Sequence, residues 1–177
     1  DCRYTHLERL EVDGDGFLVG LGLDFSSELN TLVGGRGVGK SAILETIRYI
    51  LDLPLYSPTE YRDALVGYAL GSGGKAVLHM VQYLNAGTVR RYRFERGWKE
   101  TPRVFELEPG REQGVLLSPL DVLGEREAPW YFGQKEIFDI TESLERRRLL
   151  LDEMIGKQAG AQITEVRKLE ARLRENA

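Results

Sequence analysis

The sequence has very little of what a disulfide-stabilised, zinc-binding or membrane-spanning protein needs. Cys2 is the only cysteine among 177 residues, so no disulfide framework can form within the chain. The two histidines, His6 and His79, are too isolated to suggest a metal site. No run of about 18 apolar residues is present to span a bilayer. We therefore expect a protein of the reducing cytoplasm that makes no membrane contact.

Excess charge of either sign is also lacking. The formal net charge is −4, which gives no global electrostatic reason to bind nucleic acid, so such binding would need a local basic patch. The hydrophobic fraction of 42% is that of an ordinary globular protein, and the length suits one good core. Composition alone therefore neither supports nor excludes a DNA partner.

The most specific motif is GGRGVGKS at residues 34–41, which meets the pattern GxxxxGK(S/T). A glycine-rich turn lets backbone N–H groups converge on phosphate oxygens, and a following helix adds the positive end of its dipole. Lys40 would neutralise the β- and γ-phosphates, and Ser41 would bind the Mg²⁺ that bridges them. The alternative is a glycine-rich turn without a ligand. The predicted nucleotide-binding residues are Gly34, Gly35, Arg36, Gly37, Val38, Gly39, Lys40, Ser41 and Ala42.

The flanks of this loop have the patterns that the motif requires. Before it, Leu29, Leu32 and Val33 predict a strand buried on both faces. After it, apolar residues recur at helical spacing until Pro54. These residues are Ile43, Leu44, Ile47, Ile50 and Leu51. The loop is therefore predicted to join a central strand to a packed helix.

Two antiparallel hairpins accompany this unit. The first pairs residues 7–12 with 17–25 across the DGDG turn, and the second pairs residues 76–84 with 89–95. Residues 97–119 are predicted to be irregular, with one strand at 104–107. From Glu142 onward, charge is dense and apolar residues recur at steps of three and four, which predicts a coiled coil or a solvated terminal helix. The repeating residues are Ile163, Val166, Leu169 and Leu173.

The hairpin, the loop and the segment WYFGQKEIFDIT at residues 130–141 resemble, in this order, the ATPase heads of the SMC/RecF/RecN group in the ABC superfamily. Within that group, GGRGVGKS and YFGQKEI are most similar to the SMC-like ATPases fused to PHP-type phosphoesterase domains. The resemblance implies an α/β fold, the P-loop NTPase N-terminal lobe of ABC type. It also implies a nucleotide-binding lobe at residues 1–140 and a helix at 141–177 that begins a coiled-coil arm.

The resemblance implies roles for particular residues and the cofactors ATP and Mg²⁺. Gln134 matches the glutamine that completes the metal shell and touches the attacking water. Arg62 lies where related heads carry an arginine that reaches nucleotide or DNA. Two positions depart from the pattern: Arg36 replaces the usual Asn, and Ala42 leaves only a backbone N–H to meet the α-phosphate.

Two further matches occur in the wrong place. LGSGGKAVL at residues 70–78 is similar to the signature motif, but it precedes Gln134 instead of following it. LLLDE at residues 149–153 is similar to a Walker B strand, but Asp152 and Glu153 follow Gln134 too closely and lie in an amphipathic, arginine-rich segment. We therefore expect a turn and a helix. The implied partners are a complementary lobe that carries both motifs, a second head and DNA.

The favoured hypothesis is the ATP-binding half of an SMC-like head, which hydrolyses ATP only with its complementary lobe, in DNA repair or maintenance. One alternative is a self-contained small NTPase or nucleotide kinase that uses Asp152 and Glu153. Another is a nucleic-acid-binding module with a vestigial loop, in which a basic strand alternates with aromatic residues. The residues of that strand are Arg90, Arg91, Tyr92, Arg93, Phe94 and Arg96.

Overall fold

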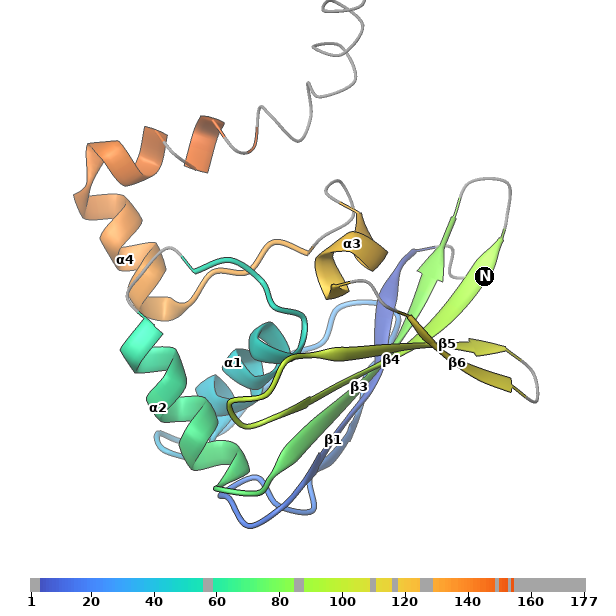
Figure 1. Ribbon diagram of the computed structural model, residues 1–177. Helices are drawn as coiled ribbons and strands as arrows, with labels where there is room; N and C mark the ends of the chain where they lie inside the picture. The colour runs from blue at the N-terminus through green and yellow to red at the C-terminus, as the bar shows by residue number, and fades with distance from the viewer. Residues whose placement is uncertain are drawn as a thin grey trace, which may run out of the picture. The chain divides into compact units, whose positions relative to one another are not determined.

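The computed structural model describes residues 4–55, 59–84, 88–108, 111–115, 118–124, 129–148, 150–152 and 154. The chain divides into two compact units, Asp1–Tyr131 and Phe132–Ala177. The first unit contains all strands of the described residues, three helices and the glycine-rich loop (Figure 1). Helix α4, Gln134–Glu142, belongs to the second unit.

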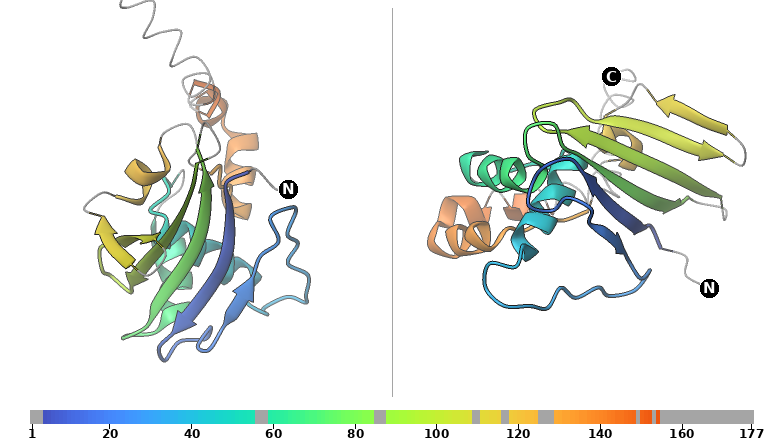
Figure 2. Two further views of the ribbon diagram at one scale, coloured as in Figure 1. Left: turned by 90° about the vertical axis from the view of Figure 1, so that its right-hand side faces the viewer. Right: turned by 90° about the horizontal axis from the view of Figure 1, so that it is seen from below.

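The strands of the first unit form one antiparallel sheet in the order β2-β1-β3-β4-β5-β6. Figure 2 shows that this sheet is twisted, as antiparallel sheets generally are. The strands are β1 His6–Asp13, β2 Gly22–Asp24, β3 Lys75–Tyr83, β4 Val89–Gly97, β5 Arg103–Glu108 and β6 Arg111–Val115. The fold is therefore α/β with antiparallel hairpins, as predicted.

The first predicted hairpin forms, but its second strand is much shorter than residues 17–25. The N–H groups of Phe17 and Leu18 donate to the carbonyl groups of Tyr68 (2.9 Å) and Ala69 (3.0 Å), at the end of helix α2, Thr59–Leu70. Donors that satisfy a helix end are not available to a sheet ladder. Strand β2 therefore begins only at Gly22.

The second hairpin, β3–β4, is confirmed, and a third hairpin, β5–β6, follows it. Strand β5 contains the expected strand at 104–107, whereas β6 replaces part of the predicted irregular stretch. Strand β6 lies at the edge of the sheet and begins with Arg111, Glu112 and Gln113. Polar residues are common on edge strands, and here they hid the alternation that would have predicted a strand.

Helix α1, Lys40–Ile50, begins directly after the glycine-rich loop and ends before Pro54, as predicted. It lies against the sheet, and α2 packs beside it (Figure 1). Helix α2 had no clear sequence signal because its apolar residues are spread around the helix. A short helix, α3 at Pro119–Leu123, begins at a capping box formed by Ser118 and Asp121.

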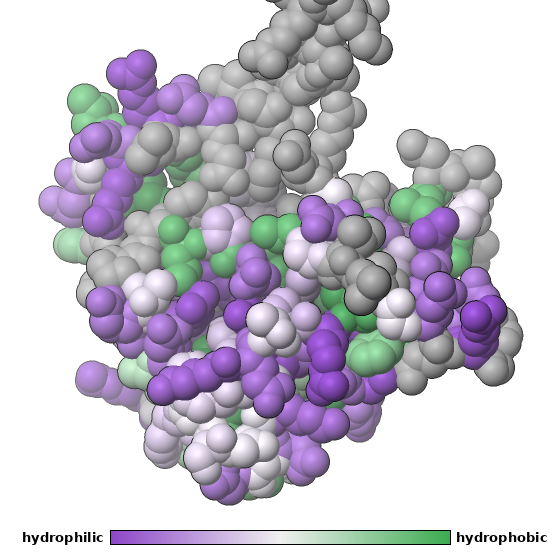
Figure 3. All heavy atoms as spheres, viewed as in Figure 1, coloured by the Kyte–Doolittle hydropathy of each residue, from purple (hydrophilic) through white to green (hydrophobic). Residues whose placement is uncertain are grey.

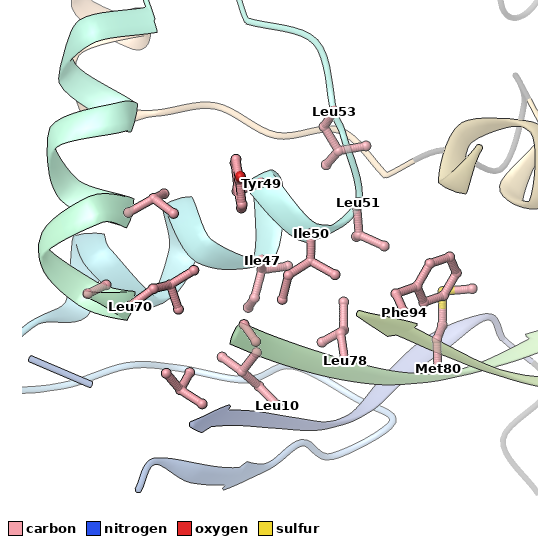
Figure 4. Close-up of a cluster of buried hydrophobic side chains, with 14 of the residues drawn as sticks. Leu10, Ile47, Tyr49, Ile50, Leu51, Leu53, Leu70, Leu78, Met80 and Phe94 are labelled. Carbon is pink, nitrogen blue, oxygen red and sulfur yellow. The ribbon is translucent and has the colours of Figure 1, made fainter. Parts of the chain in front are cut away.

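The core lies between α1 and one face of the sheet. Cross-strand pairing aligns four apolar side chains in a row, Leu10, Leu78, Phe94 and Val104, one from each of β1, β3, β4 and β5. Ile47, Ile50 and Leu51 of the α1 segment point toward this row (Figure 4). The visible outer surface of the described residues is in contrast mostly hydrophilic (Figure 3). Burial of this apolar face is what holds α1 in place.

The predicted buried strand before the loop is wrong for this chain. Residues 25–35 form no strand, and the side chains of Leu29 and Val33 are 90% and 89% exposed. Residues 26–30 form a local turn instead, in which the Asn30 amide donates to Ser26 C=O and accepts from Ser26 N–H, both at 2.8 Å. Side-chain to backbone hydrogen bonds of this kind compete with strand pairing. The chain from β2 to α1 is therefore an irregular loop outside the sheet (Figure 2).

In the second unit, α4 is followed by further helical residues at 144–148, as expected of the helical segment. Asp152 is also helical. The residues whose spacing predicts a coiled coil, Ile163, Val166, Leu169 and Leu173, lie outside the described residues. The predicted coiled-coil arm therefore stays a prediction.

We expect Leu78→Ala to lower the free energy of unfolding by about 3 kcal/mol, because it opens a cavity in the centre of the apolar row. Leu29→Ala removes the same atoms from a solvated side chain and should change the free energy by less than about 0.5 kcal/mol. Denaturant unfolding of both variants tests this difference. Equal effects would show that Leu29 is covered in solution.

Candidate functional site

The glycine-rich loop forms a tight turn that ends at the first residue of α1. Arg36 and Gly37 lie at the turn, and Gly39 is the N-cap of the helix. Gly37 and Gly39 have φ angles of 82° and 91°, in the left-handed region that side-chain-bearing residues rarely adopt. The glycines at these two positions are therefore required by the backbone path, as the motif predicts.

Close packing adds a second constraint at Gly39. A Cβ atom built on Gly39 would lie 2.8 Å from Cε1 of the Phe17 ring, which itself stacks on Tyr68 at a centroid distance of 5.1 Å. A Cβ on Gly34 would lie 2.9 Å from Cγ2 of Val38. The loop thus contacts Phe17 of the hairpin turn at Gly39, and it packs on its own Val38 at Gly34. No sequence pattern predicted the contact of Phe17 with the loop, since it joins residues far apart in the chain.

The loop directs the N-terminus of α1 outward as an anion-binding site. The first hydrogen bond across the N-cap runs from Ile43 N–H to Gly39 C=O, 2.9 Å. In an α-helix the N–H groups before that point, here of Lys40, Ser41 and Ala42, have no intrahelical acceptor. They converge with the helix dipole on the same end, which favours a phosphate. Ala42 contributes only its backbone there, because its side chain is buried in the core.

Lys40 and Ser41 are the first two residues of α1, next to the glycine-rich loop. The Lys40 ammonium bends back over the loop and donates to Gly34 C=O (2.7 Å) and Gly35 C=O (2.5 Å). Phosphate oxygens at the helix N-terminus would lie next to this ammonium. Ser41, the next residue on the same helical turn, is exposed. Its hydroxyl would be a suitable ligand for Mg²⁺ beside the phosphates, because Mg²⁺ binds few protein oxygen atoms together with phosphate oxygens.

Gln134 is the first residue of α4 and belongs to the second unit. The loop and Gln134 therefore lie in different units, each described by itself. The predicted approach of Gln134 to the metal side of the loop stays a prediction.

Arg62 is placed by its contacts on α2, beside the last turn of α1. Its Nε and Nη2 donate to Asp63 Oδ1 (3.0 and 2.8 Å), and its guanidinium lies 5.6 Å from the centroid of the Tyr49 ring. An α-helix rises about 1.5 Å per residue, so Tyr49 lies about 13 Å along the axis from Lys40. These contacts do not bring Arg62 to the loop, and its predicted nucleotide or DNA contact stays a prediction.

The basic strand β4 does not present its aromatic residues for base stacking, because Tyr92 and Phe94 are buried in the core. A hydrogen bond to the Tyr92 side chain raises the pKa of Arg90 above its ordinary value, and the negative charge of Glu106 raises it further. Each arginine has a carboxylate partner: Arg90 with Glu106 (3.5 Å), Arg91 with Glu8 (3.7 Å), Arg93 with Glu95, and Arg96 with Asp52 (2.8 Å). This arrangement favours a solvated, charge-balanced face over a nucleic-acid interface.

The two misplaced motifs have the structural roles expected for them. Ser72 and Gly73 form the bend between α2 and β3, and the Ser72 hydroxyl donates to Asp15 Oδ2 (3.2 Å). Asp152 is helical and pairs with Arg148 one turn earlier, at 3.9 Å. A Walker B aspartate would end a buried strand, and Asp152 does not. Glu153 lies outside the described residues.

Sequence reasoning missed the buried cation of α1, Arg48. Its side chain is 1% exposed. Arg48 lies one turn after Leu44 and one turn before Leu51, which the apolar pattern assigned to a packed helix. An arginine within an apolar stripe is the signal that could have identified it.

Among the described residues, no three His, Cys, Asp or Glu side chains lie close enough together to hold a metal ion. None of the helices in the described parts of the chain has the length and apolar character that crossing a membrane requires.

No protein-family model and no curated protein matches the sequence. A solved chain from work on the structural biochemistry of ATP-driven dimerization and DNA-stimulated activation of SMC ATPases is similar in structure. The TM-score is 0.58 and the sequence identity is 19%, over 84% of this chain and 99% of the solved one. The chain shares the α/β fold of that solved SMC ATPase chain. At this identity the likeness establishes the fold alone.

We expect Gly39→Ala to lower the free energy of unfolding by at least about 1–2 kcal/mol, because a side chain is strained at its φ angle and meets the Phe17 ring. Gly35→Ala is the matched control, since its added Cβ meets nothing within 4 Å and its φ is not positive. Urea unfolding of the two variants without nucleotide provides the measurement. A Gly39→Ala protein as stable as the control would contradict this loop geometry.

Proposed function

We propose that this chain is the ATP-binding N-terminal half of an SMC-like ATPase head. The observation that carries the proposal is the loop at residues 34–41, where two left-handed glycines turn the backbone into the N-terminus of α1 beside Lys40. The fold shared with a solved SMC ATPase chain supports the same conclusion.

The residues have distinct tasks in nucleotide binding. The N–H groups of residues 34–42 would surround the phosphates. The Lys40 ammonium, which donates to loop carbonyl groups here, would bind the β- and γ-phosphates, and Ser41 would hold Mg²⁺. The metal neutralises charge on the β- and γ-phosphates when it is bound. Gln134 would complete the metal shell and orient the attacking water. Residues 1–140 would form the nucleotide-binding lobe, and residues 141–177 would lead into a coiled-coil arm.

A complementary lobe would supply what this chain lacks for hydrolysis, namely the Walker B acid and the signature-motif donors. The exposed side chains of Leu29 and Val33 support such a partner, because they precede the loop in a segment with strand-like sequence. A neighbouring strand from the second lobe could order this segment and bury both side chains. We propose that the docked lobe covers residues 29–33.

Dimerization and DNA binding enter the proposal by extension. The similar solved chain comes from work on ATP-driven dimerization and DNA-stimulated activation of SMC ATPases. We propose that the completed head likewise pairs with a second head and acts with DNA, in repair or maintenance in the cytoplasm. The narrower likeness to the ATPases fused to PHP-type phosphoesterase domains stays a prediction.

We expect Lys40→Ala to weaken Mg-ATP binding by about 3 kcal/mol, or about 100-fold in Kd, because the phosphate charge loses its cationic partner. Lys75→Ala, at an exposed position on β3, removes the same group far along the chain and should leave the Kd unchanged. Gln134→Ala should also leave the Kd nearly unchanged, since one neutral ligand is lost from a shell of water and phosphate. Calorimetric titration measures all three. Unchanged affinity in Lys40→Ala would refute the assignment of the loop.

ATP turnover by residues 1–177 alone should be barely above background, and addition of the complementary lobe should raise it by orders of magnitude. Leu29→Asp should block that stimulation without changing ATP affinity, because it places a charge in the proposed lobe contact. Val19→Asp is the control, since Val19 is a similarly apolar, exposed residue on another loop. A small self-contained NTPase would instead hydrolyse ATP as a monomer and lose activity in Glu153→Gln.

A further inference from the structure

One cation is buried in the centre of the first unit, on the helix that begins at the phosphate loop. The Arg48 side chain is 1% exposed and is among the largest fully buried side chains of the described residues. Placing a charge in a protein interior costs several kcal/mol unless it is paired and hydrogen-bonded. An apolar residue of similar volume would pack at this position without that cost. The contacts of the Arg48 guanidinium should therefore indicate the role of this buried charge.

Those contacts tie two separate stretches of chain to α1. Arg48 Nε donates to Pro54 C=O (3.1 Å), Nη2 contacts the same carbonyl oxygen, and Leu53 N–H donates to Arg48 C=O (3.1 Å). Nη1 lies 3.9 Å from Oε2 of Glu45, one turn earlier on the helix. The guanidinium plane also covers the Tyr131 ring, with Cζ 4.5 Å from the ring centroid. The Arg48 side chain thus contacts both Pro54 and Tyr131.

Tyr131 has a special place in the chain. It is the last residue of the first unit, and Gln134 follows it by three positions at the start of α4. Residues 129–131 form neither helix nor strand, and the Tyr131 side chain packs against the hydrophobic core of the first unit. The stacking of Arg48 on Tyr131 is therefore a direct link between α1 and the chain that leads to Gln134.

We propose that Arg48 is a positioning residue that couples the phosphate loop to the glutamine segment through Tyr131. Lys40 and Arg48 belong to the same helix, so the rigid α1 connects the phosphate loop to the guanidinium that contacts Tyr131. The planar guanidinium can hydrogen-bond a carbonyl in its plane while its face lies on an aromatic ring, which neither an ammonium nor an apolar side chain can do. This inference rests on the proposed binding of ATP at the loop.

The two tryptophans of the chain make the coupling measurable. Trp98 and Trp130 are the only ones, and Trp130 is the neighbour of Tyr131. In a Trp98→Phe background, fluorescence reports on residue 130 alone. Mg-ATP should change the Trp130 emission in this background. The change should fall at least about fivefold in Tyr131→Leu and in Arg48→Met, while the Kd measured by calorimetry shifts by less than about threefold.

Conservative replacement separates positioning from general stability. Tyr131→Phe keeps the ring under the guanidinium and should retain the full Trp130 response, whereas Tyr131→Leu should lose it. Without nucleotide, acrylamide should quench Trp130 more strongly in Tyr131→Leu than in Tyr131→Phe, because the segment is released from α1. A variant that lost only stability would change its unfolding midpoint and not the Trp130 response.

The outcomes distinguish the two proposals. Normal ATP binding with an undiminished Trp130 response in Tyr131→Leu and Arg48→Met overturns the coupling and leaves the proposed function intact. Normal binding with no Trp130 response in the background protein overturns the coupling as well. Failure of the background protein to bind ATP overturns the proposed function, and the coupling with it.

Discussion

The structure depends on one row of apolar side chains that crosses the sheet beneath α1. Leu10, Leu78, Phe94 and Val104 are aligned by strand register, and Ile50 of α1 packs toward them. A shift of one residue in any of these strands would turn its apolar set toward water. Because α1 is fixed by this contact, so is its N-terminus, and the N-terminus is where the glycine-rich loop must present its N–H groups.

The loop receives a second support from the first hairpin. The turn after β1 donates to the carbonyl groups that end α2, and this places the Phe17 ring against Gly39. The same hydrogen bonds keep Phe17 and Leu18 out of strand pairing with β1, so β2 is short and the hairpin turn supports the loop instead. Sheet, helix end and loop are thus linked in one unit, and the geometry of the phosphate site follows from packing far outside it.

Local patterns predicted the loop, α1 and the β3–β4 hairpin, because spacing alone encodes a left-handed glycine turn, a 3.6-residue period and a two-residue period. The alternation of Tyr92 and Phe94 with arginines marked β4 but could not show which set of side chains faces the core. The strand at Leu29 and Val33 was predicted from hydrophobicity, which cannot reveal whether a neighbouring strand is present to pair with it. The contact of Phe17 with Gly39 was not predictable, because it depends on where two distant turns meet.

The turn between Ser26 and Asn30 has a consequence for how the chain behaves while it stands alone. An extended apolar segment beside an edge strand is a template for pairing with another copy, and such segments promote aggregation. The Asn30 amide occupies both the N–H and the C=O of Ser26, which closes this stretch on itself. The Asn30 side chain thus leaves the backbone groups of Ser26 unavailable to a neighbouring strand.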